Sequence, residues 1–137
     1  MDLLSIDLWK RFLQKENSSS PLSRESMNYH NKRFRPVSTS SNGEVSEDTV
    51  FHYRQSGNVL TCEYSGENIV AGHLIGIVDP DGNIDMRYHQ VNAQGQLMTG
   101  ICHSRPEVLP NGKIRLYESW KWTSGDGSEG QSVLEEF

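Results

Sequence analysis

The sequence has few cysteines, no long apolar run and no excess of basic residues, and each absence argues against a class of protein. Only two of its 137 residues are cysteine, too few for a disulfide framework. No apolar run approaches the roughly 20 residues that cross a bilayer, and the N-terminus lacks the pattern of a secretory signal. The net charge of -5 opposes binding to nucleic acid or to an anionic membrane. We therefore expect a cytoplasmic protein with neither of these partners.

Motifs for enzymatic chemistry are also missing. The sequence contains no G-x-x-x-x-G-K-[ST] loop, no G-x-G-x-x-G turn after a strand and no G-x-S-x-G elbow. Cys102 and His103 are adjacent, so on a strand they point to opposite faces and cannot form a nucleophile and base pair. No two histidines have metal-ligand spacing, although His89 and His103 could meet across strands near Asp85. We expect no catalytic residue, no metal and no cofactor.

The first 26 residues differ in pattern from the remainder. Residues 5–14 are predicted to form a short amphipathic helix, because apolar side chains recur at helical spacing at Leu4, Leu8 and Phe12. Residues 17–25, NSSSPLSRE, have a composition that resists regular structure. The predicted organisation is a helix and linker over 1–26 and a β-barrel domain over 27–137. The helix would either dock on the barrel or a partner, or be a simple extension.

Regularly spaced turn signals in the remainder predict an antiparallel all-β protein. Short alternating runs are separated about every ten to fifteen residues by turn sequences, at residues 57–58, 66–68, 80–82, 93–95 and 110–112. The first is typical of a two-residue hairpin loop, and the others are typical of three-residue turns that begin or end with glycine. About eight strands result, a number that closes readily into a small barrel. The predicted fold is an up-and-down meander closed into such a barrel.

The loop lengths also predict the register of the strands. They place Leu60 near Leu74, Tyr88 opposite Gly100 and Cys102 opposite Trp120, so the large apolar side chains share one face. The opposite face collects charged and polar groups that would be costly to bury, namely His52, Arg54, Glu63, Asp85, Arg87, His89, His103, Arg105, Arg115 and Lys121. We interpret the first face as the inside of the barrel and the second as the outside.

The inner face contains the candidate binding residues. Glu118 is predicted to point inward beside Ser104, where a carboxylate needs a partner and burial would raise its pKa. Aromatic side chains around a few polar groups are typical of a small-molecule site, here Tyr88, Gln90, Cys102, Ser104, Glu118, Trp120 and Trp122. The alternatives are that the aromatic residues only fill the core and that Glu118 is hydrated at the rim. On the outer face, a partner surface is predicted at Arg87, His89 and His103.

Two segments carry a resemblance to a known family, GNIDMRYHQVNAQGQLMTGICHS and PNGKIRLYESWKWTSGDGSEGQSVLEEF. Over residues 27–137 the chain resembles a group of small bacterial proteins that often carry the name N-acetylglutamate synthase. That name implies acetyl transfer from acetyl-CoA, which GNAT-type acetyltransferases bind on a Q/R-x-x-G-x-G/A loop opening a helix. The sequence has neither feature there, so a non-enzymatic role is expected. The predicted barrel is similar to avidin-like and lipocalin-like (calycin-like) folds.

These observations leave three functions open. The preferred interpretation is a barrel that binds an unidentified small molecule. The alternative is an interaction protein or self-associating scaffold, with a homodimer as one form. The third is the acetyltransferase that the family resemblance implies.

Overall fold

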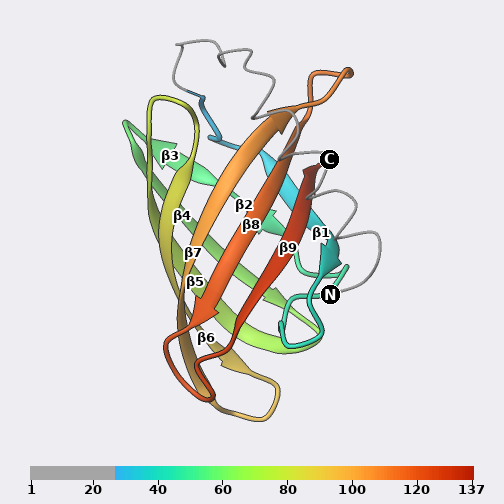
Figure 1. Cartoon of the computed structure of the whole chain (residues 1–137), viewed down its shortest axis with the longest axis vertical. Helices are drawn as coiled ribbons and strands as arrows, with labels where there is room; N and C mark the ends of the chain where they lie inside the picture. The colour runs from blue at the N-terminus through green and yellow to red at the C-terminus, as the bar shows by residue number, and fades with distance from the viewer. Residues whose placement is uncertain (1–26) are drawn as a thin grey trace.

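The computed structural model describes residues 27–137. The predicted N-terminal helix and linker lie outside the described residues. Figure 1 shows the described chain as one antiparallel sheet rolled into a nearly closed barrel. The strands are β1 (Arg33–Thr39), β2 (Phe51–His52), β3 (Arg54–Ser56), β4 (Val59–Gly66), β5 (Ile69–Val78), β6 (Ile84–Asn92), β7 (Leu97–Val108), β8 (Ile114–Trp122) and β9 (Glu129–Glu136).

The barrel is brought nearly to closure by the segment that contains β2 and β3. From β3 to β9 each strand pairs with the next along the chain, β9 then pairs with β1, and β1 pairs with β2. Tyr53 lies between β2 and β3; its N–H donates to the Lys32 carbonyl and its carbonyl accepts from the Asn31 N–H, both at 2.9 Å. One extended segment therefore contacts both edges of the sheet. The predicted all-β meander is confirmed, and the strand count is nine because this segment is interrupted at Tyr53.

Most of the predicted register is also confirmed. Tyr88 lies opposite Gly100 and Cys102 lies opposite Trp120. Three of the predicted three-residue turns end in a glycine that occupies the left-handed region of backbone conformation. The φ angle is 85° at Gly82, 78° at Gly95 and 84° at Gly112.

The prediction for the turn at residues 66–68 is wrong. Gly66 belongs to β4, the turn has two residues, and a bulge lies between Tyr64 and Gly66. Leu60 therefore pairs with Gly76, and Leu74 pairs with Cys62. The shift is two residues, so Leu60 still points inward, since side chains alternate with a period of two.

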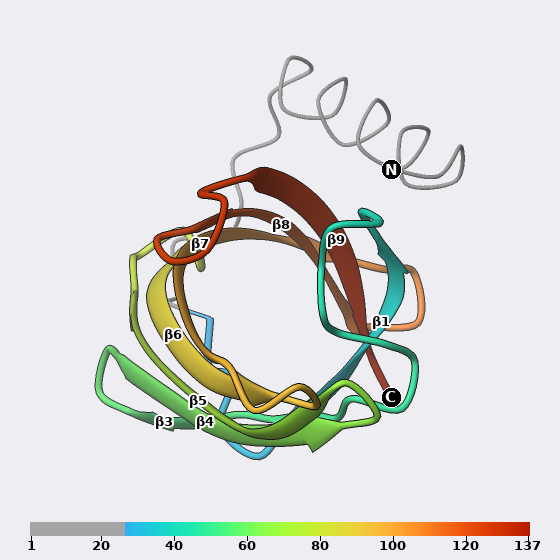
Figure 2. The same cartoon turned by 90° about the horizontal axis from the view of Figure 1, so that it is seen from below.

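The two ends of the barrel are built differently. The packed end, at the top of Figure 1, contains the turns at 57–58, 79–83 and 109–113; the mouth, at the bottom, contains the turns at 67–68, 93–96 and 123–128 and the loop at 40–50. The packed end is filled by fully buried side chains, including Tyr29, Phe34, Leu60, Ile84 and Leu116. Figure 2, seen from below, looks toward the mouth.

The outer surface of β8 and β9 carries one buried pair. Tyr117 and Val133 lie opposite each other and point outward, yet they are only 1% and 0% exposed. The Tyr117 hydroxyl donates to Glu107 at 2.9 Å, and Val37 packs against the pair. A small second cluster therefore stabilises this part of the wall from outside.

Candidate functional site

A cavity lies inside the barrel toward the mouth. It has a volume of about 60 Å³, and its wall is largely aromatic and aliphatic with a few polar side chains. The lining residues are Gly43, Glu44, Val45, Phe51, Tyr53, Tyr64, Leu74, Met86, Tyr88, Gln90, Cys102, Glu118, Trp120, Trp122 and Ser132. Such a mixture is typical of small-molecule sites, although their volumes are usually about 300–1,000 Å³.

Glycines on neighbouring strands make room for the aromatic rings of the wall. A Cβ atom at Gly100 would overlap the ring of Tyr88, and one at Gly130 would overlap the indole of Trp120. Trp120 and Trp122 meet edge to face with ring centroids 5.9 Å apart, an arrangement that aromatic pairs prefer. The glycines and the ring contacts together hold the aromatic wall in one arrangement.

Glu118 is the acidic group that the barrel strands contribute to the cavity. It is 8% exposed, and the Ser104 hydroxyl donates to its Oε2 at 2.6 Å. Burial raises the pKa of this carboxyl from 4.5 to about 7, and the hydrogen bond from Ser104 opposes that shift. Glu118 is thus a buried carboxyl whose protonation changes near neutral pH. It lies inside the barrel and not at the open rim, which was the alternative position.

Tyr53 presents a second polar group. Its ring is fully buried and lines the cavity. Its hydroxyl is a buried polar atom with no hydrogen-bond partner among residues 27–137. Because an unpaired buried hydroxyl costs roughly 1–3 kcal/mol, a ligand that accepted a hydrogen bond from it would remove a penalty.

The structure brings the predicted site residues together. Six of the seven line the cavity, namely Tyr88, Gln90, Cys102, Glu118, Trp120 and Trp122. Ser104 is buried and contacts the cavity group Glu118. Burial also raises the pKa of the Cys102 thiol well above its usual value, which disfavours the reactive thiolate.

The residues that close the mouth were not predicted from the sequence. Gly43, Glu44 and Val45 come from the loop at 40–50, which joins β1 to β2 across the cavity. The Trp122 indole N–H donates to the Asn42 carbonyl at 3.2 Å and fastens this loop to β8. No periodic pattern identifies residues of an irregular loop, whereas Phe51 and Tyr53 could have been included from their inward positions in the register.

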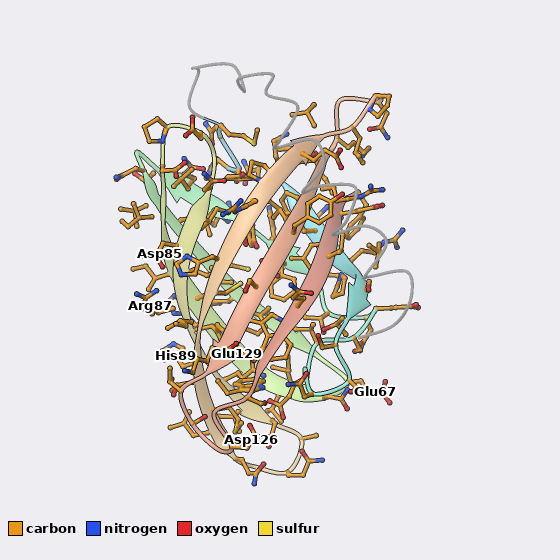
Figure 3. All side chains as sticks on the ribbon, viewed as in Figure 1. Glu67, Asp85, Arg87, His89, Asp126 and Glu129 are labelled. Carbon is orange, nitrogen blue, oxygen red and sulfur yellow. The ribbon has the colours of Figure 1, made fainter. Side chains whose placement is uncertain are left out.

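The predicted partner residues lie on the outside of the barrel. Figure 3 shows Asp85, Arg87 and His89 along the outside of β6. Arg87 Nη1 lies 2.6 Å from Asp85 Oδ1, and His103 Nδ1 lies 3.6 Å from the same atom. His89 does not meet His103, because its Nε2 lies 3.1 Å from Nδ1 of His73 on β5. These contacts tie the outer groups to one another within the sheet.

No three or more His, Cys, Asp or Glu side chains within residues 27–137 are grouped so that they could hold a metal ion. No helix in the same range is long and apolar enough to cross a membrane.

The nearly closed antiparallel barrel with a cavity near its mouth defines a class, the small calycin-like β-barrel proteins. The model of the family described as "Avidin-like protein" matches residues 27–137, and the chain belongs to this family. No curated protein matches the sequence. The predicted likeness to avidin-like barrels is confirmed, while the resemblance to proteins named N-acetylglutamate synthase stays a prediction.

Proposed function

We propose that this protein binds a small molecule in the cavity near its mouth. The observation that carries the proposal is the presence of Glu118 and the unpaired Tyr53 hydroxyl inside a largely aromatic wall. A core that served only as scaffold would gain stability from apolar groups of the same shape at both positions. Two buried polar side chains in the wall of one cavity instead suit a ligand with its own donors and acceptors.

The size of the cavity adds a condition to this proposal. A volume of about 60 Å³ holds a few waters rather than a metabolite. The loop at 40–50 supplies three of the lining residues and is irregular, whereas most of the others lie on paired strands. Binding of a larger molecule therefore requires this loop to move away from the mouth.

Tryptophan fluorescence tests the proposal, because Trp120 and Trp122 line the cavity. The remaining tryptophan, Trp9, is replaced by phenylalanine so that the signal reports on the cavity. The protein is titrated with a metabolite library that includes biotin, which avidin binds. A saturable change with at least one compound is expected, and its absence across the library would overturn the proposal.

A matched pair of variants then locates the site. Glu118→Gln keeps the shape of the side chain but removes its charge, and Ser119→Ala changes the exposed neighbour on the same strand. We expect Glu118→Gln to weaken binding about tenfold or more while the fold is kept, and Ser119→Ala to leave the affinity unchanged. Acetyl-CoA turnover with glutamate would instead support the enzyme that the resemblance implies.

A second candidate function is self-association through the outer face of β4 and β5. Val59, Ile75 and Ile77 are 38%, 49% and 50% exposed there, and Val59 pairs with Ile77 across the strands. Ile75 lies opposite Arg87 of the predicted partner surface. Light scattering measures whether the protein is a dimer, and Ile75→Lys would dissociate a dimer formed through this face.

A further inference from the structure

The mouth of the barrel contains two amides that hold one carboxylate. Gln90 Nε2 donates to Glu44 Oε1 at 2.7 Å, and Asn92 Nδ2 donates to Glu44 Oε2 at 2.8 Å. Both amide side chains are buried, at 4% and 2% exposed. Each oxygen of the carboxylate thus has its own donor, and hydrogen bonds to an ionised acceptor are stronger than neutral ones.

The direction of both donors is fixed by other bonds. The Tyr64 hydroxyl donates to Gln90 Oε1 at 2.8 Å, so the NH₂ group of Gln90 faces the mouth. The backbone N–H groups of Gln94 and Gln96 donate to Asn92 Oδ1 at 3.1 and 2.9 Å. If the carboxylate left, neither amide could turn without breaking these bonds. The N–H of each amide that donates to Glu44 would lose its acceptor, and Asn92 Nδ2 would keep its bond to Gln96 Oε1 at 2.9 Å.

Glu44, in contrast, belongs to the irregular loop rather than to the wall. The loop is fastened by Asn42, whose carbonyl accepts from Trp122 at 3.2 Å and whose Nδ2 donates to Ser128 Oγ and the Glu129 carbonyl at 3.0 and 2.9 Å. Because this loop covers the cavity, a ligand that enters through the mouth must displace Glu44. Gln90 and Asn92 would keep their positions, because they belong to β6.

We propose that Gln90 and Asn92 form a carboxylate subsite, that Glu44 fills it in the unliganded protein, and that the ligand is a small monocarboxylate. This inference rests on the proposed function. A ligand carboxylate that replaced Glu44 would restore both charge-assisted hydrogen bonds, whereas a neutral ligand would restore weaker ones. The rest of the ligand would lie in the cavity against Tyr88, Trp120 and Trp122.

The negative charges around the mouth lead to a second testable consequence of the proposal, a dependence of binding on salt. Glu67, Asp126 and Glu129 lie around the lower end of the barrel (Figure 3). Their field opposes the approach of an anion, and salt screens such exposed charges over about 10 Å at 0.1 M. Binding of a monocarboxylate should therefore tighten as the salt concentration rises, whereas binding of its neutral amide should not depend on salt.

The experiment compares hexanoate with hexanamide on the full chain. Binding is measured by tryptophan fluorescence for the unchanged protein, for Glu44→Ala and for Glu47→Ala, which alters an exposed acid of the same loop. We expect hexanoate to bind at least about tenfold more tightly than hexanamide, since one strong hydrogen bond is worth about a factor of ten. Glu44→Ala should strengthen hexanoate binding about tenfold or more, because the internal competitor is gone. Glu47→Ala should have no such effect.

Other outcomes separate this inference from the function on which it rests. Equal binding of hexanoate and hexanamide to Glu44→Ala would overturn the carboxylate subsite and leave small-molecule binding intact. The same conclusion follows if neither compound binds while another member of the metabolite library does. If no compound binds either the unchanged protein or Glu44→Ala, the subsite and the proposed function both fail.

Discussion

The packed end and the mouth of the barrel are built from the same strands but differ in composition. At the packed end Tyr29, Phe34 and Tyr53 form a cluster of rings, with centroids 5.0 to 6.2 Å apart. Toward the mouth the interior positions hold Glu118 and Gln90 beside aromatic rings that border a cavity. One end thus has the close packing of a protein core, and the other has buried polar groups beside a cavity.

The contrast shows how a small barrel can combine a scaffold with a site. Buried apolar area at the packed end supplies stability, so the wall of the cavity can keep the Glu118 carboxyl and the unpaired Tyr53 hydroxyl, which lower it. Ser104 and Glu118 pair across β7 and β8 between the two ends. Four measurements test this division, from the largest expected effect to the smallest.

Truncation at the packed end should have the largest effect on stability. Phe34 is fully buried, and Phe34→Ala should lower the free energy of unfolding by about 3–5 kcal/mol because it leaves a cavity among the rings. Urea denaturation measures the change. The control is Lys121→Ala, an exposed residue of β8, which should stay within about 0.5 kcal/mol. Similar losses in both variants would contradict the assignment of the packed end as the stabilising part.

Ionisation of Glu118 should make stability depend on pH. Its pKa is raised from 4.5 to about 7 in the folded protein, so the folded state binds this proton more tightly than the unfolded state. This tighter proton binding stabilises the folded state fully below pH 4.5, and the stabilisation is lost as the pH rises to about 7. The free energy of unfolding should fall by about 3 kcal/mol over this range. Glu118→Gln should remove this loss, and Glu47→Gln should retain it. If the free energy of unfolding of Glu118→Gln depended on pH as it does in the unchanged protein, another group would be responsible for the titration.

Removal of the unpaired Tyr53 hydroxyl should change the stability by a smaller amount. Unlike the loss of most buried groups, it should not lower the stability. Tyr53→Phe should leave stability unchanged or raise it by about 1 kcal/mol, because it deletes a buried donor without a partner. Tyr64→Phe is the matched variant, since its hydroxyl donates to Gln90, and it should lose about 1 kcal/mol. Thermal denaturation compares the two. A loss in Tyr53→Phe as large as in Tyr64→Phe would mean that its hydroxyl has a partner.

Deletion of residues 1–26 should have the smallest effect. All nine described strands pair among themselves, so a protein that starts at Met27 is expected to fold with a change of about 0.5 kcal/mol or less. Circular dichroism and urea denaturation measure it. Failure of this shorter protein to fold would place the N-terminal segment within the domain and contradict the boundary proposed from sequence.

Much of the interior was predictable because turn chemistry sets register. The glycines of three tight turns fix the loop lengths, and those lengths place Tyr88 on Gly100 and Ser104 beside Glu118. The burial of Glu118 follows from its position in this register. Local sequence was sufficient at these positions because each pairing depends on one hairpin.

The parts that could not be predicted depend on distant contacts. The bulge near Gly66 lies where a Cβ atom would meet the Thr49 side chain, a neighbour from another segment of the chain. The position of Glu44 depends on Gln90 and Asn92, which lie in β6. Neither contact leaves a periodic or turn signal in the sequence. The shifted register of β4 and the closure of the mouth by Glu44 could therefore be found only in the structure.

The pairing of β1 with β9 has a consequence for how the chain folds. It joins Phe34 to Glu136, nearly the whole length of the described residues, so this contact has a higher loop-closure cost than any single hairpin. Barrels with such non-local pairings fold in about milliseconds to seconds. During synthesis the hairpins from β3 to β8 can form in order, but the barrel cannot close until β9 has left the ribosome. Until then the edge of β1 remains open to pairing with other chains.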